Sequence, residues 1–187
     1  MELMVVLAVI GIALAVAIPS FGTMRRNARM TGAANDLIAS INLARSEAIK
    51  RQVPVAMCGS ANPRAADPSC SDTLTGWVVW EDTNNDRVVG ADEPVLSTHD
   101  ALAPELTVSD NFAVISYAGT GFPQDLVLPP AILLCDDRRD HSAEGRLYRR
   151  IVSVSRTGRP AILKTATEVA AFREQAPPPI ESSCNAG

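Results

Sequence analysis

An apolar run close to the N-terminus constrains this chain more than any other feature. From Leu3 to Ile18 every residue is apolar if Gly11 is counted, and no charged residue lies between Leu3 and Met24. As a helix, residues 3–18 span roughly 24 Å, and residues 19–24 extend the segment towards the thickness of a bilayer core, about 30 Å. We therefore expect residues 1–24 to cross a membrane as a helix.

A cleaved signal peptide is the alternative interpretation, but it needs a basic segment before the apolar run and a small-residue cleavage site behind it. Here Glu2 precedes the run, and the sequence after Pro19 remains compatible with a helix. Residues 25–52 carry an apolar stripe at helical spacing, formed by Met30, Ala34, Leu37, Ile41, Ala44 and Ala48. We expect one helix over residues 2–51, kinked at Pro19, where the ring removes a backbone hydrogen bond.

The length and composition of the chain indicate one folded unit with an appended segment. The chain has 187 residues and a formal net charge of -4, so any site for a polyanion must be local.

His99 and His141 lie in polar segments with no nucleophile motif nearby, and we expect solvated surface roles for both. Asp136 and Asp137 are neighbours on an expected strand and would point to opposite faces. We expect no enzyme activity and no cofactor.

The four cysteines are expected to form disulfides. Cys58, Cys70, Cys135 and Cys184 have none of the short spacings typical of a zinc site or a thioredoxin-like motif. An even number of cysteines in a membrane-tethered chain fits an oxidising compartment such as the periplasm. Three pairings are possible. Sequence proximity favours Cys58–Cys70, which leaves Cys135–Cys184 to attach the C-terminal tail to the body.

Beyond residue 52 the helical period stops and β-type runs follow. These runs cover residues 53–58, 76–82, 112–119, 131–137 and 147–155, separated by clusters of Gly, Pro, Asn and Asp. One long helix followed by strands indicates an α+β fold, with antiparallel sheet packed on residues 25–52. We expect a β-rich head over residues 53–187, whose proline-rich end, residues 174–187, is extended.

The helix and its continuation resemble a known family. "ELMVVLAVIGIALAVAIPSF" looks like the N-terminal region of type IV pilins and type II secretion pseudopilins. "NLARSEAIKR" and the valine-rich strand after it are similar to the GspH/FimT family of minor pilins and pseudopilins, which includes FimU. The resemblance implies a pilin helix on a β-sandwich-like head, other pilins as partners, and a single pass through the inner membrane with the head in the periplasm. It also implies that Glu2 and Pro19 are assembly residues, because Glu2 would pair with the N-terminal amine of an adjacent subunit.

The resembled precursors begin with a short basic leader that prepilin peptidase removes, and the new N-terminal phenylalanine is methylated. Met1 stands about where the fourth residue of the mature family sequence would be, so we expect a late start codon or a truncation rather than a protein without processing. The basic residues Arg25, Arg26 and Arg29 alone would keep that end of the span cytoplasmic. The cysteines and the resemblance favour a periplasmic head, and long domains translocate largely regardless of charge.

The segment "DTNNDRVVGADE" matches part of a calcium loop. Asp82, Asn84, Asp86 and Glu93 occupy the first, third, fifth and twelfth places of an EF-hand loop. Arg87 stands at the sixth place, where a glycine makes the sharp turn, and strands rather than helices are expected on both sides. A hairpin connection rich in Asn and Asp explains the same residues, and we favour it over a metal site.

A basic stretch near the C-terminus is a candidate for binding double-stranded DNA. Residues 145–164 contain no acidic residue and six basic ones, namely Arg146, Arg149, Arg150, Arg156, Arg159 and Lys164. Arginine forks suit phosphate oxygens. In FimT-type proteins that bind DNA for natural transformation, a Gly-Arg-any-Arg motif makes the contact; Gly158 and Arg159 match it, whereas Ala161 replaces the second arginine. Alternatively, the arginines lie on a solvated strand face or pair with acidic residues of neighbouring subunits, and we favour this interpretation.

Together these features predict a structural minor pilin or pseudopilin, placed at the tip or in the initiation complex of a type IV pilus or a type II secretion pseudopilus. A FimT-like DNA-binding subunit that acts in DNA uptake is the alternative. The residues do not separate the pilus from the secretion machinery, whereas the neighbouring genes would.

Overall fold

The computed structural model describes residues 2–110, 112–124, 129–138, 146–175 and 184. Within the helices and strands, the side chains of residues 3, 5, 8, 11–20, 146–148, 166 and 172–175 lie outside the description. In this part of the chain, one long helix, α1 (Glu2–Arg51), precedes eight strands and a second helix, α2 (Ala166–Gln175). The predicted helix over residues 2–51 is confirmed.

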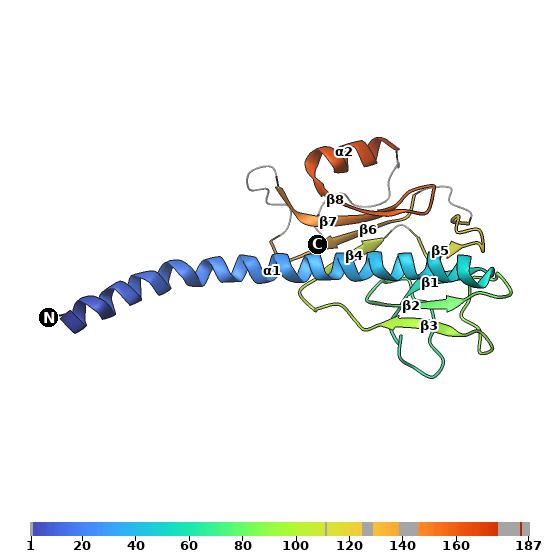
Figure 1. The fold of residues 1–187 in the computed structure, drawn as a ribbon, viewed down its shortest axis with the longest axis horizontal. Helices are drawn as coiled ribbons and strands as arrows, with labels where there is room; N and C mark the ends of the chain where they lie inside the picture. Colours follow the sequence, from blue (N-terminus) through green and yellow to red (C-terminus); the bar gives the residue numbers. More distant parts are fainter. Residues whose placement is uncertain (1, 111, 125–128, 139–145, 176–183, 185–187) are drawn as a thin grey trace.

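Helix α1 has favourable charges at both ends. Glu2 lies in the first turn and Lys50 and Arg51 in the last, so each charge opposes the local sign of the helix dipole. The next residue, Gln52, has φ 60° and donates its amide to the carbonyl of Ala48, which ends the helix. Figure 1 shows an unbroken helix that bends in its N-terminal part, the part that contains Pro19.

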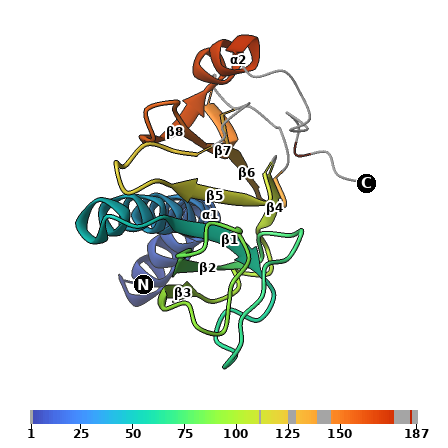
Figure 2. The ribbon, with the colours of Figure 1, turned by 90° about the vertical axis from the view of Figure 1, so that its right-hand side faces the viewer.

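The strands form two antiparallel sheets. Sheet A has the order β3-β2-β1-β5, and sheet B has the order β4-β6-β7-β8. The strands of sheet A are β1 (Val55–Ser60), β2 (Gly76–Glu81), β3 (Val95–His99) and β5 (Val114–Tyr117). Those of sheet B are β4 (Thr107–Asp110), β6 (Ala131–Cys135), β7 (Arg146–Val154) and β8 (Pro160–Thr165). Figure 2 shows the two sheets one above the other, with α1 beside them.

The main core lies where both sheets meet the C-terminal half of α1. The six residues of the predicted apolar stripe are all at most 1% exposed. They pack in one cluster with side chains of sheet A such as Trp77 and of sheet B such as Ile132. The α+β expectation is therefore confirmed, and the N-terminal half of α1 projects beyond the head (Figure 1).

Two disulfides hold loops to this scaffold. Cys58 in β1 is bonded to Cys70, 12 residues away, and Cys135 in β6 is bonded to Cys184, 49 residues away. These are the pairs that sequence proximity favours. The second bond ties a residue close to the C-terminus to the end of β6, so the head includes the tail at that point.

Four elements were not predicted: β3, β4, β8 and α2. Strands β3 and β4 are short edge strands with no fully buried residue, so their sequences lack a clear alternation. Helix α2 has a capping box, in which the Thr165 hydroxyl accepts from the Glu168 amide at 3.2 Å and the Glu168 carboxylate accepts from the Lys164 and Thr165 amides. These amides lower the pKa of Glu168. The prediction of an extended tail was wrong for residues 174 and 175, which belong to α2.

Candidate functional site

The basic stretch folds into a hairpin whose turn carries two of the candidate arginines. The turn between β7 and β8, residues 155–159, is closed by the Ser155 amide on the Arg159 carbonyl at 2.9 Å and the Gly158 amide on the Ser155 carbonyl at 2.8 Å. The Ser155 hydroxyl also accepts from the Arg159 amide at 3.1 Å. Arg156 and Arg159 are exposed on this turn. The hydrogen bonds therefore fix the backbone of the turn from which the two exposed arginine side chains extend.

Gly158 has a structural role in this turn. Its φ is +80°, and a Cβ built there would lie 2.8 Å from Cε1 of Tyr117 and 3.2 Å from the Gly121 carbonyl oxygen. The buried Tyr117 hydroxyl donates to the Gly158 carbonyl at 3.0 Å, and burial raises the pKa of Tyr117. Backbone conformation and packing thus both require glycine here. This explains Gly158 without reference to DNA.

Helix α1 supports the same region. Arg45 Nε donates to the Gly121 carbonyl at 2.9 Å, and a Cβ on Gly121 would lie 2.5 Å from Cδ1 of Ile49. Two large apolar side chains are exposed beside these contacts: Ile49 at 44% and Phe122 at 58%. We call Ile49, Phe122, Arg156 and Arg159 the tip surface. It is assembled from α1, the turn after β5 and the β7–β8 turn.

The remaining basic candidates lie away from the tip surface. Arg150 is in register with Leu134 of β6, whereas the β7–β8 turn follows Val154, so Arg150 and Arg156 are six residues or about 20 Å apart along an extended chain. Arg149 and Arg150 are half-buried, and burial lowers the pKa of Arg150, as does the nearby Arg138. Lys164 and Ala161 are exposed on β8. The structure therefore does not gather the six predicted DNA-binding residues (Arg149, Arg150, Arg156, Gly158, Arg159, Lys164) on one site.

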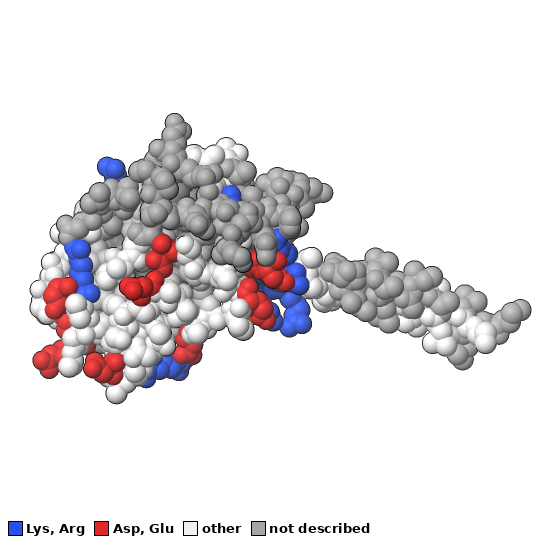
Figure 3. Space-filling model, turned by 180° about the vertical axis from the view of Figure 1, so that it is seen from behind, with Lys and Arg blue, Asp and Glu red and all other residues white. Residues whose placement is uncertain are grey.

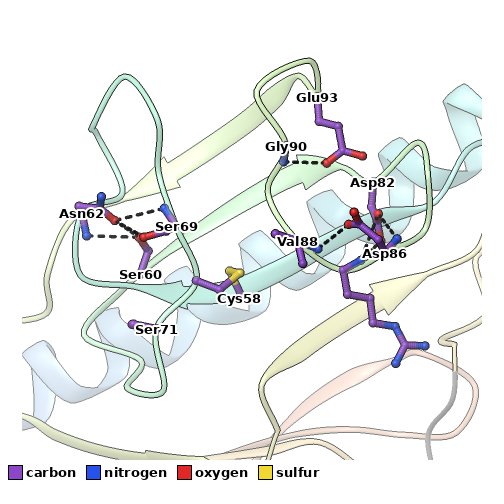
Figure 4. The surroundings of a disulfide bond; sticks show 12 residues. Cys58, Ser60, Asn62, Ser69, Ser71, Asp82, Asp86, Val88, Gly90 and Glu93 are labelled. Carbon is purple, nitrogen blue, oxygen red and sulfur yellow. Dashed lines mark hydrogen bonds between the residues drawn. A yellow bond between two sulfur atoms is a disulfide. The ribbon is translucent and has the colours of Figure 1, made fainter.

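The acidic segment connects β2 to β3, and we call residues 82–94 the acidic loop. Asp82 is buried, and its carboxylate accepts from the amides of Asp86 at 3.0 Å and Arg87 at 3.3 Å. Burial raises the pKa of Asp82. Carboxylate oxygens of Asp82, Asp86 and Glu93 lie within 4.8 Å of one another, and Figure 4 shows them grouped in the loop.

The structure bears on both interpretations of this loop, the hairpin connection and the calcium site. The flanking strands pair antiparallel in one sheet, which confirms the hairpin connection. Arg87 has φ 63°, the left-handed conformation that glycine adopts at the sixth place of a calcium loop, and the Asn84 amide nitrogen donates to Asp86 at 2.8 Å. Calcium binding stays a prediction. Calorimetric titration of the full chain tests it, since an absence of heat at millimolar calcium would reject it.

Charged pairs join α1 to the head where the helix leaves it. Arg26 lies 3.2 Å from Asp137, and Arg29 lies 2.9 Å from Glu105. Asp136 instead accepts from Arg138, whose Nη1 donates to the Asn27 side chain at 2.9 Å. Figure 3 shows basic and acidic side chains side by side at this junction. Strand β6 ends at Cys135, so the prediction that Asp136 and Asp137 lie on a strand was wrong; Asp136 is buried and Asp137 is exposed. Arg26 and Arg29 are balanced by carboxylates of the head.

His99 does not have the solvated role that the sequence suggests. Its ring stacks on Trp77 with centroids 3.8 Å apart, because β2 and β3 place these residues in register. Its Nδ1 lies 2.7 Å from the Asp100 carbonyl and its Nε2 lies 3.5 Å from Asp36 of α1. Within the described residues, no hydroxyl or thiol is hydrogen-bonded to this ring. His141 lies outside the described residues.

The projecting part of α1 carries exposed apolar side chains. Met4 is 79% exposed, Phe21 65% and Met24 69%. A search of the described residues finds no helix with the length and apolar character needed to cross a membrane. The side chains of residues 11–20 lie outside that description, so the span over residues 1–24 stays a prediction.

Comparisons with known proteins were made against families, curated sequences and solved structures. The profile of the family described as type II transport protein GspH matches residues 33–158. The crystal structure of the type IV minor pilin FimU of Pseudomonas aeruginosa PAO1 in space group P21 aligns with a TM-score of 0.49 and 18% identity, over 72% of this chain and 87% of that one. The minor pseudopilin EpsH from the type 2 secretion system of Vibrio cholerae aligns with a TM-score of 0.49 and 9% identity, over 73% and 97%. No curated protein sequence matches.

Proposed function

The chain belongs to the GspH family of type II transport proteins, as the match over residues 33–158 shows, and we propose that it is a structural subunit at the tip or in the initiation complex of its filament. It is a minor pilin or pseudopilin of the GspH/FimT type. The filament is a type IV pilus or a type II secretion pseudopilus. We infer a structural rather than a catalytic role.

The projecting helix carries this proposal. Among its described side chains, the projecting part of α1 exposes seven large apolar ones to at least 49%, and the first buried residue beyond them is Met30. These seven are Met4, Val6, Leu7, Val9, Ile10, Phe21 and Met24. An apolar surface of this kind is normally covered by a partner. In our proposal the inner membrane covers it before assembly, and helices of other pilins cover it in the filament core.

Glu2 is the residue whose role is most open to test. A carboxylate within an apolar environment is unfavourable by a few kcal/mol without a cationic partner, and we propose that the partner is the N-terminal amine of an adjacent subunit. Glu2→Ala in the full-length precursor should leave membrane insertion intact and impair incorporation into the filament. Asp67→Ala, which removes an exposed carboxylate of the head, is the control. Normal incorporation of Glu2→Ala would refute the role.

We propose a periplasmic head and processing of the precursor by prepilin peptidase, followed by methylation. The two disulfides support an oxidising compartment. Mass spectrometry of the mature chain from membranes would identify the cleaved and methylated N-terminus. The mass of an unprocessed chain would contradict this part of the proposal. The genes that neighbour the gene of this protein would distinguish a type IV pilus from type II secretion machinery.

Binding of double-stranded DNA is the second candidate function. The observation that favours it is that Arg156 and Arg159 are exposed on one turn and, within the described residues, form no ion pair. Two phosphate contacts predict a slope of about -1.8 for log K against log salt. Arg156→Ala with Arg159→Ala should abolish binding of duplex DNA by the full chain, whereas Arg64→Ala should not. Binding of duplex DNA that is unchanged by Arg156→Ala with Arg159→Ala would reject the hypothesis.

A further inference from the structure

A small pocket opens where α1 leaves the head, and we call it the junction pocket. Its volume is about 160 Å³. Strands β4 and β6 pair antiparallel with Thr107 opposite Cys135, so the residues just before β4 lie beside those just after β6. This register places both segments against residues 26–29 of α1 (Figure 3). Of the described residues, six line the pocket, namely Arg26, Arg29, Glu105, Leu106, Asp136 and Asp137.

The base of the junction pocket is fixed by a buried ion pair. The Asp136 side chain is 3% exposed and accepts from Arg138, whose Nη1 donates to Asn27 of α1 at 2.9 Å. Arg138 also donates its backbone amide to the Asp136 carboxylate at 3.0 Å. Breaking a buried pair is strongly unfavourable, because it leaves an unpaired charge in the interior. The charges available to a ligand therefore lie on the rim of the pocket.

The rim consists of two arginines and two carboxylates whose pairing is weak. Arg26 lies 3.2 Å from Asp137, and Arg29 lies 2.9 Å from Glu105. The four side chains are between 42% and 57% exposed. Exposed ion pairs contribute little to stability, so these groups can exchange one partner for another with a small change in free energy.

The rim charges fit a zwitterion that carries a phosphate and a primary ammonium. Guanidinium groups donate paired hydrogen bonds to phosphate oxygens, and an ammonium donates up to three hydrogen bonds to carboxylates. A lone anion would be repelled by the two rim carboxylates, and a lone cation would be repelled by the two arginines. The volume is well below the roughly 300–1,000 Å³ of sites for drug-sized ligands, so the pocket has room for a small headgroup.

The junction pocket directly follows the apolar part of α1. Phe21 is 65% exposed and Met24 is 69% exposed. Arg26 comes two residues after Met24, or about 3 Å further along the helix axis. In the proposed function this apolar part lies in the inner membrane before assembly. The pocket then lies at the depth of the lipid headgroups, so a headgroup can enter it while the acyl chains stay in the bilayer.

We propose that the junction pocket binds the headgroup of phosphatidylethanolamine, with the phosphate between Arg26 and Arg29 and the ammonium against Asp137 and Glu105. This inference rests on the proposed function, because a membrane-anchored chain meets the lipid at this depth. The bound lipid fixes the orientation of the head on the membrane surface before assembly. When the chain leaves the bilayer for the filament, the two ion pairs seen in the structure replace the contacts with the lipid.

Native mass spectrometry of the full chain in detergent, with one phospholipid added at a time, tests the preference. The chain should retain phosphatidylethanolamine roughly fivefold more than phosphatidylcholine or phosphatidylglycerol, which corresponds to the loss of one exposed ion pair. Phosphatidylcholine has a quaternary ammonium that donates no hydrogen bond, and phosphatidylglycerol has no ammonium. Equal retention of the three lipids would overturn the proposal.

Paired substitutions separate the two halves of the headgroup. Glu105→Gln with Asp137→Asn removes the ammonium contacts and keeps both guanidiniums, so the preference should reverse in favour of phosphatidylglycerol. Arg26→Gln with Arg29→Gln should lower retention of phosphatidylethanolamine to that of phosphatidylcholine. Arg64→Gln, which breaks an exposed ion pair outside the pocket, is the matched control and should change nothing. A preference that survives both paired substitutions would overturn the proposal.

The proposed function and this site can fail separately. Resistance of the chain to carbonate extraction from membranes reports on the membrane anchor, whereas lipid preference in detergent reports on the pocket. An anchored chain without the preference would reject the pocket alone. A chain that carbonate extracts, but that still prefers phosphatidylethanolamine, would reject the anchor of the proposed function and support headgroup binding by the pocket.

Discussion

Gly158→Ala should destabilise the head substantially, because the turn allows neither the backbone conformation nor the volume of alanine. The φ of +80° lies in the left-handed region, where a non-glycine residue is unfavourable by about 1–2 kcal/mol. The new Cβ would lie 2.8 Å from Cε1 of the buried Tyr117. Overpacking of this kind costs about 1–3 kcal/mol. Reduced entropy of the unfolded chain offsets about 0.4–1 kcal/mol.

The expected net loss is therefore about 1–5 kcal/mol of unfolding free energy, with a central value of about 3 kcal/mol. For a chain of this size, that lowers the midpoint of thermal unfolding by on the order of 10 °C. Tryptophan fluorescence during denaturation of the full chain in detergent measures it, since Trp77 and Trp80 are both buried in sheet A. Gly32→Ala in α1 is the matched control: nothing lies within 4 Å of the added Cβ, and helix propensity predicts a gain of about 1 kcal/mol.

A loss below about 1 kcal/mol in Gly158→Ala would refute this reasoning, because it would show that the turn relaxes away from Tyr117 at little cost. Loss of DNA binding at unchanged stability would also contradict it. That result would assign Gly158 to the nucleic-acid contact of the resembled motif instead of to the fold.

Three further changes test other parts of the structure. Tyr117→Phe leaves the buried Gly158 carbonyl without its donor and should lower the unfolding free energy by about 1–3 kcal/mol in thermal denaturation, whereas an unchanged midpoint would contradict the bond. Cys135→Ser with Cys184→Ser opens a loop with a sequence separation of 49 and should lower the unfolding free energy measured in urea by about 4 kcal/mol. An unchanged unfolding free energy would show that the attached tail does not stabilise the head. Because burial raises the pKa of Asp82, its carboxylate destabilises the fold above that pKa, and the effect disappears as the pH falls through it. Asp82→Asn should therefore be at least as stable as the parent chain at pH 7 and lose that advantage by pH 4; lower stability at both pH values would refute this.

The long helix could be predicted from sequence because its signal is local. The apolar run, the stripe from Met30 to Ala48 and the charges at both ends define α1 within its own 50 residues. The strands with strong apolar runs were predicted for the same reason. The edge strands β3 and β4 were missed, since half-exposed strands of 5 and 4 residues carry little periodicity. Helix α2 could have been found from its Thr165–Glu168 capping box.

The sequence by itself determined the long helix, its buried face and the residue types available for binding, because these follow from composition and from spacing over a few residues. Only the tertiary structure decided which of them meet. It placed Gly158 under Tyr117, 41 residues away, and it separated Arg150 from Arg156 along β7. It also stacked His99 on Trp77 across two strands. Such contacts depend on strand register and on packing against the helix, and no local pattern of residues encodes them.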